Sequence, residues 1–272
     1  MIKLNKEKNI GVIFEPRSGS TVLTSYLSQS TNMINLEEIF VASATQKISI
    51  HKLNNTVTVS KDDEFIQPYG TVEVKKVLDA RFANWKSVEK INLSIVKIYV
   101  ESYINVYPEF TSILKNENMQ FINLERADFF YSFISTNVSD RDNQWHNVDK
   151  ISARRELEKY SIAPEYLIRW CNNYIKKTDH IRNHFPDIPT IYYEQFQNNI
   201  HALRKMFTGI PNILPSIPYT KFLGKQTDYI ENIDELTDCF LEFANKNKEY
   251  FPAYFNEIPG IKLPDIREKS IC

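Results

Sequence analysis

Short apolar and β-branched segments alternate with segments of helical periodicity along most of this chain. The β-rich runs cover residues 9–14, 91–100, 119–125 and 188–194. Each run is followed by a stretch whose apolar side chains recur at helical spacing. Because parallel strands are joined by crossover helices, four strands each followed by a helix predict a parallel sheet with right-handed crossovers. We therefore expect an α/β fold with a central parallel sheet flanked by helices.

Other segments differ in how clearly they predict an element. A helix is expected over residues 19–30, and another over residues 161–185, where Pro186 ends the pattern. Residues 71–90 carry an apolar stripe typical of a helix. Residues 41–68 are polar and β-branched, which indicates a loop or a hairpin insertion.

Length and charge limit the classes of function. The chain has 272 residues, of which 42% are hydrophobic, and we interpret residues 1–272 as a single domain. Its 33 basic and 34 acidic residues leave a net charge of -1, without the basic excess of a nucleic-acid binder. The N-terminus has no apolar signal region, and no stretch approaches the roughly 18 to 20 apolar residues of a membrane span. We expect a cytoplasmic protein with no membrane span and no nucleic-acid partner.

No pattern in the chain favours a metal site or a disulfide. Cys171, Cys239 and Cys272 are scattered, without the CxxC or Cys/His spacing of a zinc site. His180 and His184 share a helix face at i, i+4, but not within an HExxH motif. We interpret the two histidines as a solvated or stacked pair and expect no metal.

The turn PRSGST, residues 16–21, is the clearest functional signal in the chain. It follows the first strand, and ligands of parallel α/β folds bind at the carboxyl ends of strands. Small residues at a helix start let backbone N–H groups point at an anion, and Arg17, Ser18, Ser20 and Thr21 add donors. The turn therefore predicts a phosphate or sulfate site. The alternative is an ordinary strand-to-helix turn capped by Ser18.

The same turn departs from the G-x-x-x-x-G-K-[ST] loop of ATP- and GTP-binding proteins. Glu15 or a neighbour stands at the first glycine, and Ser20 stands where that loop has its lysine. Without the lysine that reaches the terminal phosphates, an ATPase or a kinase is disfavoured.

Two segments resemble the sulfotransferases that use 3'-phosphoadenosine 5'-phosphosulfate (PAPS). PRSGST is similar to the family's 5'-phosphosulfate loop, in the carbohydrate and bacterial trehalose-sulfotransferase-like branches, which carry Arg where steroid and phenol enzymes carry Lys. FINLERADFFYSFIS, residues 121–135, is similar to the family's strand, Arg-Asp, helix and Ser element. The resemblance implies a P-loop-like three-layer domain that binds PAPS.

The resemblance assigns the two ends of PAPS to different residues. The 5'-phosphosulfate would be held by the turn, at Arg17, Ser18, Gly19, Ser20 and Thr21. The 3'-phosphate would be held by Arg126 and Ser135. The interval from Arg126 to Ser135 is one residue longer than is usual in the family, so Ser132 stays an alternative.

Weaker similarities suggest residues for the acceptor side. INLEEIF, residues 34–40, is similar to a segment that places a Glu before an aromatic pair, which implies Glu38, or else Glu37, as the base. A surface acidic pair is the alternative. Lys97 matches a lysine that the family directs at its substrate, although a lysine can also mark an edge strand.

Two further segments extend the resemblance, and a third region is the one where it is thinnest. TIYYEQF, residues 190–196, is similar to a strand end whose Tyr and Glu are mainly structural. Residues 211–272 would cover the cofactor, with Lys221 or Lys225 near the 3'-phosphate. Residues 41–90 would form the variable acceptor side.

The sequence thus predicts transfer of a sulfuryl group from PAPS to a hydroxyl acceptor, a small molecule or a glycan. Arg17, Glu38 and Lys97 are the expected catalytic residues. Two alternatives are a non-catalytic nucleotide-binding protein of the same fold and a divergent phosphotransferase, which would need a divalent metal.

Overall fold

The computed structural model describes residues 1–5, 8–31, 34–35, 48–52, 55–59, 94–99, 119–142, 158–208, 226–263 and 266. Within these ranges the strands are β1 (Ile2–Lys3), β2 (Asn9–Phe14), β3 (Ile34–Asn35), β4 (Ile48–Lys52), β5 (Asn55–Val59), β6 (Ser94–Tyr99), β7 (Met119–Glu125), β8 (Thr190–Tyr192) and β9 (Phe207–Thr208). The helices are α1 (Ser20–Thr31), α5 (Phe129–Asp142), α6 (Pro164–His184), α7 (Ala202–Met206) and α8 (Ile233–Lys246). Short 3-10 turns are η1 (Tyr193–Gln195), η2 (Gln226–Tyr229), η3 (Lys248–Tyr250) and η4 (Pro252–Phe255).

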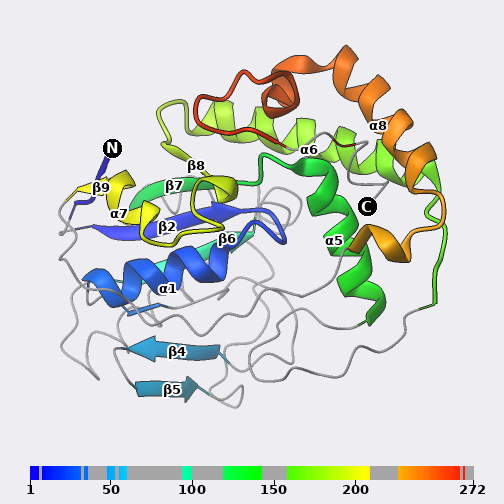
Figure 1. Ribbon diagram of the computed structural model, residues 1–272. Helices are drawn as coiled ribbons and strands as arrows, with labels where there is room; N and C mark the ends of the chain where they lie inside the picture. The colour runs from blue at the N-terminus through cyan, green and yellow to red at the C-terminus, as the bar shows by residue number, and fades with distance from the viewer. Residues whose placement is uncertain are drawn as a thin grey trace, which may run out of the picture.

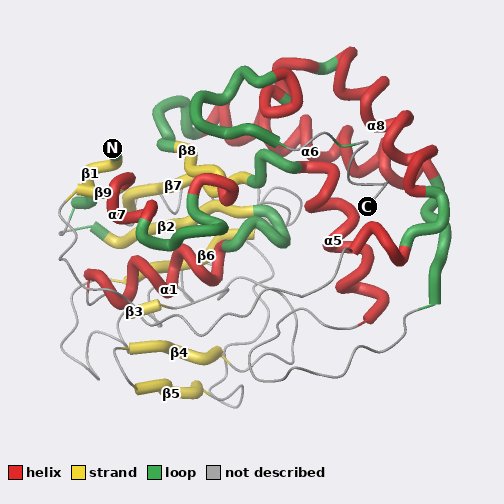
Figure 2. Tube along the Cα trace, in the orientation of Figure 1, coloured by secondary structure: helices red, strands yellow, loops and turns green. Residues whose placement is uncertain are grey.

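A seven-stranded sheet forms the centre, in the order β5-β4-β3-β6-β2-β7-β8 (Figure 2). The five strands from β3 to β8 pair in parallel, and β4 and β5 form an antiparallel hairpin at one edge. A separate two-stranded parallel sheet joins β1 to β9. The described part of the chain is therefore an α/β fold whose main sheet is largely parallel, as the alternation of strands and helices predicts.

Strand β2 lies in the interior of the sheet, between β6 and β7. Its residues Ile10, Val12, Ile13 and Phe14 are all buried, so both faces of the strand are covered. A continuous apolar run of this kind suits a parallel strand with helices above and below it.

Helices cover the sheet from two sides. In Figure 1, α1 lies below β2, whereas α6 and α8 lie above β7 and β8. Leu23 and Leu27 of α1 pack in one apolar cluster with β2, β7 and β8. A second cluster, rich in phenylalanine, joins α5, α6 and α8, with Phe133 and Phe240 fully buried. In α6 and α8 the buried residues recur at helical spacing, whereas α5 is buried on nearly all sides, with Ser132, Ser135, Thr136 and Ser139 among its buried residues.

Most of the predicted elements are confirmed where the structure describes them. Strands are present at 9–14 and 119–125 as predicted, and within 91–100 as β6. The helix expected over 161–185 is α6, and the insertion at 41–68 contains the hairpin of β4 and β5. The helix expected over 71–90 lies outside the described residues.

The predicted strand 188–194 is too long. Strand β8 ends at Tyr192, and residues Tyr193–Gln195 form a 3-10 turn. The Gln195 side chain accepts a hydrogen bond from the Tyr192 N–H at 3.0 Å, so the chain turns away from the sheet there. Apolar and aromatic residues continue in the sequence past Tyr192, where β8 ends. The pattern therefore predicts a longer strand than the one that forms.

Candidate anion-binding site

The two motif segments meet at one edge of the sheet. Strands β2 and β7 are parallel neighbours, with Phe14 in register with Leu124. The turn at 16–21 and the segment that begins at Arg126 therefore leave the sheet side by side, at the carboxyl ends of their strands. Ligands of parallel sheets bind at this edge.

The turn has an unusual backbone. Arg17 has φ 62° and Gly19 has φ 79°, two left-handed residues within three positions. A Cβ at position 19 would overlap the Tyr193 ring, so glycine is required there for space as well as for backbone angle. Helix α1 begins immediately afterwards at Ser20, and its first N–H groups have no acceptor within the helix. The turn thus presents the positive end of a helix beside an arginine.

Ser18 supplies a test of whether an anion fits the turn. Its side chain is fully buried, and its Oγ makes no hydrogen bond with the described residues. A buried hydroxyl without a partner costs free energy, typically about 1–3 kcal/mol. An anion oxygen held by the turn would satisfy this hydroxyl, so the residues present fit such a ligand.

Helix α5 binds to the turn through two serines. Arg17 Nε donates to Ser135 Oγ at 3.0 Å, across 118 positions of sequence. Ser132 Oγ donates to the Pro16 carbonyl at 3.2 Å. Both serines are buried, and both lie on the face of α5 that meets the turn. The predicted alternatives at 132 and 135 therefore both reach the turn, one through backbone and the other through the arginine.

Arg126 is held by several groups. Its Nη1 donates to the Arg17 carbonyl at 2.9 Å, and its Nε lies 3.6 Å from a Glu194 carboxylate oxygen. Its guanidinium carbon lies 4.8 Å from the centre of the Tyr131 ring and 5.1 Å from that of Tyr193. These contacts fix the guanidinium and connect β7 to the turn after β2.

Glu194 organises the start of the second segment. Its two carboxylate oxygens accept the N–H groups of Ala127, at 2.8 Å, and Asp128, at 3.2 Å, while one of them pairs with Arg126. Glu194 thus binds groups within the protein, and the mainly structural role that the resemblance implies for the Tyr-Glu strand end stays a prediction. The contact of Tyr193 with Gly19 and Arg126, in contrast, could not be inferred from the sequence, because an aromatic pair before a Glu carries no signal of what it touches.

The electrostatics of the site are dominated by two neighbouring guanidinium groups. Burial lowers the pKa of Arg17, and the positive charge of Arg126 lowers it further. Burial raises the pKa of Tyr131 and of Tyr193, although Arg126 opposes the shift in each. Arginine stays protonated at neutral pH, so two like charges are held close together in a largely buried place. A doubly charged anion would relieve their repulsion.

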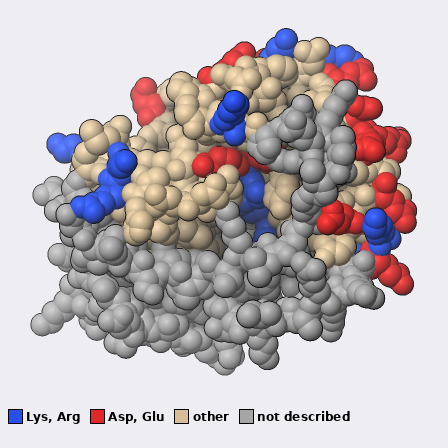
Figure 3. All heavy atoms as spheres, in the orientation of Figure 1, with Lys and Arg blue, Asp and Glu red and all other residues tan. Residues whose placement is uncertain are grey.

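On the face drawn in Figure 3, the described residues form no extended basic surface. On this face, the described Asp and Glu side chains gather towards α8. The net charge of -1 likewise predicts that any bound anion is held locally.

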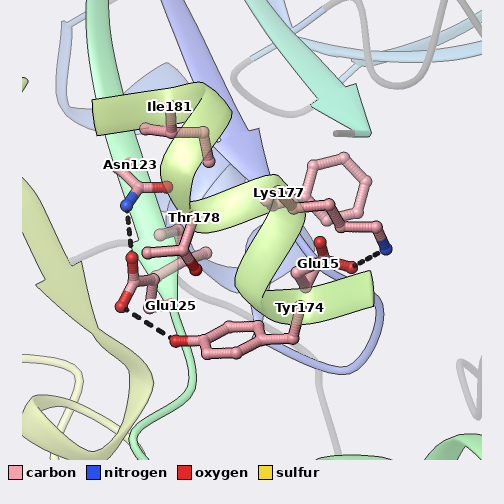
Figure 4. A pocket seen from close by; sticks show the side chains of 9 residues that line it. Glu15, Asn123, Glu125, Tyr174, Lys177, Thr178 and Ile181 are labelled. Carbon is pink, nitrogen blue, oxygen red and sulfur yellow. Dashed lines mark hydrogen bonds and ion pairs between the residues drawn. The ribbon is translucent and has the colours of Figure 1, made fainter. Parts of the chain in front are cut away.

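A second polar cluster lies under α6 at the same strand ends (Figure 4). Asn123 Nδ2 donates to Glu125 Oε1 at 2.6 Å, and Tyr174 Oη lies 3.5 Å from the other oxygen. Lys177 Nζ pairs with Glu15 at 3.1 Å. Burial raises the pKa of Glu125, while the bond from Asn123 acts in the opposite direction. The cavity among these side chains measures about 10 Å³, roughly the space of one water, so it is no ligand pocket.

The remaining expected residues have different outcomes. Lys97 lies on β6, opposite Val12 in an inner strand of the sheet, so the edge-strand alternative is wrong. Glu37, Glu38 and the lysines at 221 and 225 lie outside the described residues.

The histidine pair is stacked as predicted, with ring centres 4.0 Å apart. Within the ranges that the structure describes, no group of three or more His, Cys, Asp and Glu side chains is placed to hold a metal, and Cys171 and Cys239 form no disulfide. None of the helices in those ranges has the length and hydropathy that a bilayer crossing requires.

Comparison with protein-family models, with curated proteins and with solved structures finds no match to this chain. The class that the fold and the site define is an α/β protein with a basic, hydroxyl-lined site at the carboxyl edge of a parallel sheet.

Proposed function

We propose that this protein transfers a sulfuryl group from PAPS to a hydroxyl acceptor, with a carbohydrate as the favoured acceptor class. The observation that supports this most directly is the 3.0 Å hydrogen bond from Arg17 to Ser135. It brings together two loops that are distant in sequence, each resembling one of the two phosphate-binding elements of sulfotransferases. A nucleotide with anionic groups at both ends needs two such elements close to each other.

The order of the strands also supports the proposal. Along the sheet, the parallel strands run β3-β6-β2-β7-β8, so the first of them in the chain, β2, lies between the third and the fourth. After β2 the chain forms β3 and β6 on one side of it, and then β7 on the other side. The carboxyl end of β2 is therefore a topological switch point. We propose that the domain is P-loop-like and three-layered, with the turn in the position of its phosphate loop.

The chain's own residues would act mainly by positioning and charge neutralisation. The donor supplies an activated sulfuryl group attached to a phosphate. Arg17 and the N–H groups at the start of α1 would neutralise the charge that develops on that phosphate as the acceptor oxygen replaces it on sulfur. Glu38 would accept the proton of the acceptor hydroxyl, which is worth roughly 10²–10⁴ in rate. Lys97 would lie towards the acceptor.

Titration calorimetry of the purified protein tests the binding part of the proposal. We expect micromolar binding of 3'-phosphoadenosine 5'-phosphate, the desulfonated product, with much weaker binding of AMP and ATP. A preference for ATP, or no binding of the bisphosphate, would overturn the proposal.

A Glu38→Gln variant separates an enzyme from a non-catalytic nucleotide-binding protein. We expect transfer of radiolabelled sulfate to fall strongly while the affinity for the bisphosphate stays close to that of the wild type. Transfer that is unchanged would remove Glu38 from the mechanism. Wild-type turnover that EDTA abolishes would favour the metal-dependent phosphotransferase instead.

A further inference from the structure

The N-terminus of α5 is closed by groups of the protein itself. The N–H of Tyr131 donates to Asp128 Oδ1 at 3.2 Å, and the N–H of Phe130 donates to Tyr254 Oη at 2.8 Å. The N–H of Asp128, just before the helix, donates to Glu194. A helix start whose N–H groups already have acceptors offers few donors to an anion. We therefore expect the second motif to bind a ligand mainly through its side chains.

Tyr254 joins this helix start to the C-terminal part of the chain. Its hydroxyl, on the 3-10 turn η4, donates to Asp128 Oδ1 at 2.9 Å and accepts from the Phe130 N–H. Burial raises the pKa of the Tyr254 phenol, and the charge of Asp128 raises it further, so the phenol keeps its proton at neutral pH. One hydroxyl thus holds both the side chain that caps α5 and the second N–H of the helix.

Two serines of α5 depend on where the helix begins. Ser132 donates to the Pro16 carbonyl, and Ser135 accepts from Arg17. Ser135 is also the residue that the resemblance assigns to the 3'-phosphate, together with Arg126. Arg126 precedes the helix and is held separately, by its bond to the Arg17 carbonyl. Because the residues of a helix move together, a shift of its start would change the position of Ser135 relative to Arg126.

We propose, building on the sulfotransferase function above, that Tyr254 is a positioning residue for the 3'-phosphate of the nucleotide. It holds the start of α5 so that Ser135 and Arg126 can contact the same phosphate group. The turn after β2 has supports of its own, in the bond to the Arg17 carbonyl and in the ring that packs against Gly19. Tyr254 therefore acts on the 3' end of the nucleotide more than on the 5' end.

Selectivity for the 3'-phosphate tests this role. The measurement is the ratio of the affinities for adenosine 3',5'-bisphosphate, by calorimetry, and for 5'-AMP, by displacement of the bisphosphate, in wild type and Tyr254→Phe. Phenylalanine keeps the ring and removes both hydrogen bonds of the hydroxyl. A neutral hydrogen bond corresponds to roughly threefold to tenfold in an equilibrium constant. We expect the ratio to fall by that factor while the affinity for 5'-AMP changes little.

Tyr250→Phe is the matched control. Tyr250 lies on η3, and its hydroxyl donates to Asp179 of α6 at 2.8 Å. The variant removes a bond of the same kind, from a phenol to a carboxylate, in the neighbouring 3-10 turn, but the lost bond leads to α6 and not to α5. We expect the wild-type ratio. General damage lowers the fraction of molecules that bind and leaves the ratio unchanged, so the ratio separates positioning from a loss of stability.

A second background tests whether Tyr254 acts through Ser135. Ser135→Ala by itself should lower the ratio, because it removes a contact with the 3'-phosphate. Once the Ser135 hydroxyl is absent, Tyr254→Phe should lower the ratio further by a smaller factor than it does in the wild type. Equal factors in the two backgrounds would mean that Tyr254 does not act through Ser135, which would overturn the proposed role.

Asp128→Asn tests the same contact where Tyr254→Phe does not fold. Asparagine keeps an acceptor for the Tyr254 hydroxyl and removes the charge, so the ratio should fall in the same direction by a smaller factor. A wild-type ratio in these variants, or an equal loss of affinity for the two nucleotides, would overturn the positioning role and leave the sulfotransferase function intact. Failure of the wild type to bind either nucleotide would overturn both proposals.

Discussion

At the carboxyl ends of β2 and β7, charged side chains lie in two places, under α6 and at the turn. The two clusters differ in how their charges are paired. Under α6, Glu15 meets Lys177 at 3.1 Å and Glu125 accepts a bond from Asn123, so each carboxylate has a partner of suitable chemistry nearby. At the turn, Arg17 and Arg126 are like charges close enough to affect each other. Glu15 directly precedes the turn and Glu125 directly precedes Arg126. Under α6 the cation Lys177 pairs with Glu15, whereas at the turn the two guanidinium groups lie near each other and Arg126 also pairs with Glu194.

The largest expected effect is at the turn. Gly19→Ala should lower the free energy of unfolding by about 2–4 kcal/mol, because strain at a positive φ and overlap with the Tyr193 ring add together. Chemical denaturation measures it. Gly260→Ala is the control, since Gly260 has φ 77° but no atom within 4 Å of the added Cβ. Equal losses in the two variants would show that the ring does not restrict position 19.

The next largest effect is expected at the ion pair of Lys177 and Glu15 under α6. Lys177→Met removes the cation beside Glu15, whose side chain is 19% exposed, and should cost about 2 kcal/mol of stability. Affinity for the bisphosphate should change little. The control is Lys246→Met, which breaks an ion pair of side chains that are 68% and 71% exposed and should change stability little. A large loss of affinity in Lys177→Met would mean that the two clusters are coupled.

The stability of the protein should also depend on pH through Glu125, in the cluster under α6. Burial raises the pKa of Glu125, so its contribution is greatest below the ordinary glutamate pKa and is lost as pH rises through the raised value. Glu125→Gln should therefore flatten the fall of stability with pH above about 4.5, by up to roughly 1.4 kcal/mol per pH unit. Denaturation midpoints across pH measure this.

Glu242→Gln is the control of opposite sign. Its bond with Lys246 lowers the pKa of Glu242, so any contribution of the native residue is present above the ordinary pKa and is lost as pH falls. The same change of slope in both variants would argue against burial as the cause.

The smallest expected effect compares two changes of one residue at the turn. Arg17→Gly should be more stable than Arg17→Ala by about 1 kcal/mol, because glycine accepts the positive φ that alanine resists. Thermal unfolding measures the difference. Both variants lack the guanidinium, so both should lose the same affinity for the bisphosphate. Equal stabilities would indicate that the turn relaxes when the arginine side chain is removed.

Local pattern was sufficient for the elements around the site. The continuous apolar run at β2 predicts a strand that is buried on both faces, and the structure buries it so. The helical spacing of Leu23 and Leu27 predicts the buried face of α1. The position of the turn at the end of β2 follows from these two predictions. The end of β8 did not follow, since a single side-chain bond from the Tyr192 N–H to Gln195 decides it.

The sequence by itself determined the alternation of strands and helices, the place of PRSGST between them, and the local character of any anion attraction. Only the tertiary structure decided that Arg17 reaches Ser135, that Arg126 supports the Arg17 carbonyl, and that Tyr193 lies against Gly19. The physical reason is the distance in sequence over which the two kinds of interaction act. Strand and helix periodicities are set by neighbours a few positions apart, whereas these contacts join residues more than 100 positions apart and depend on which strands become neighbours in the sheet.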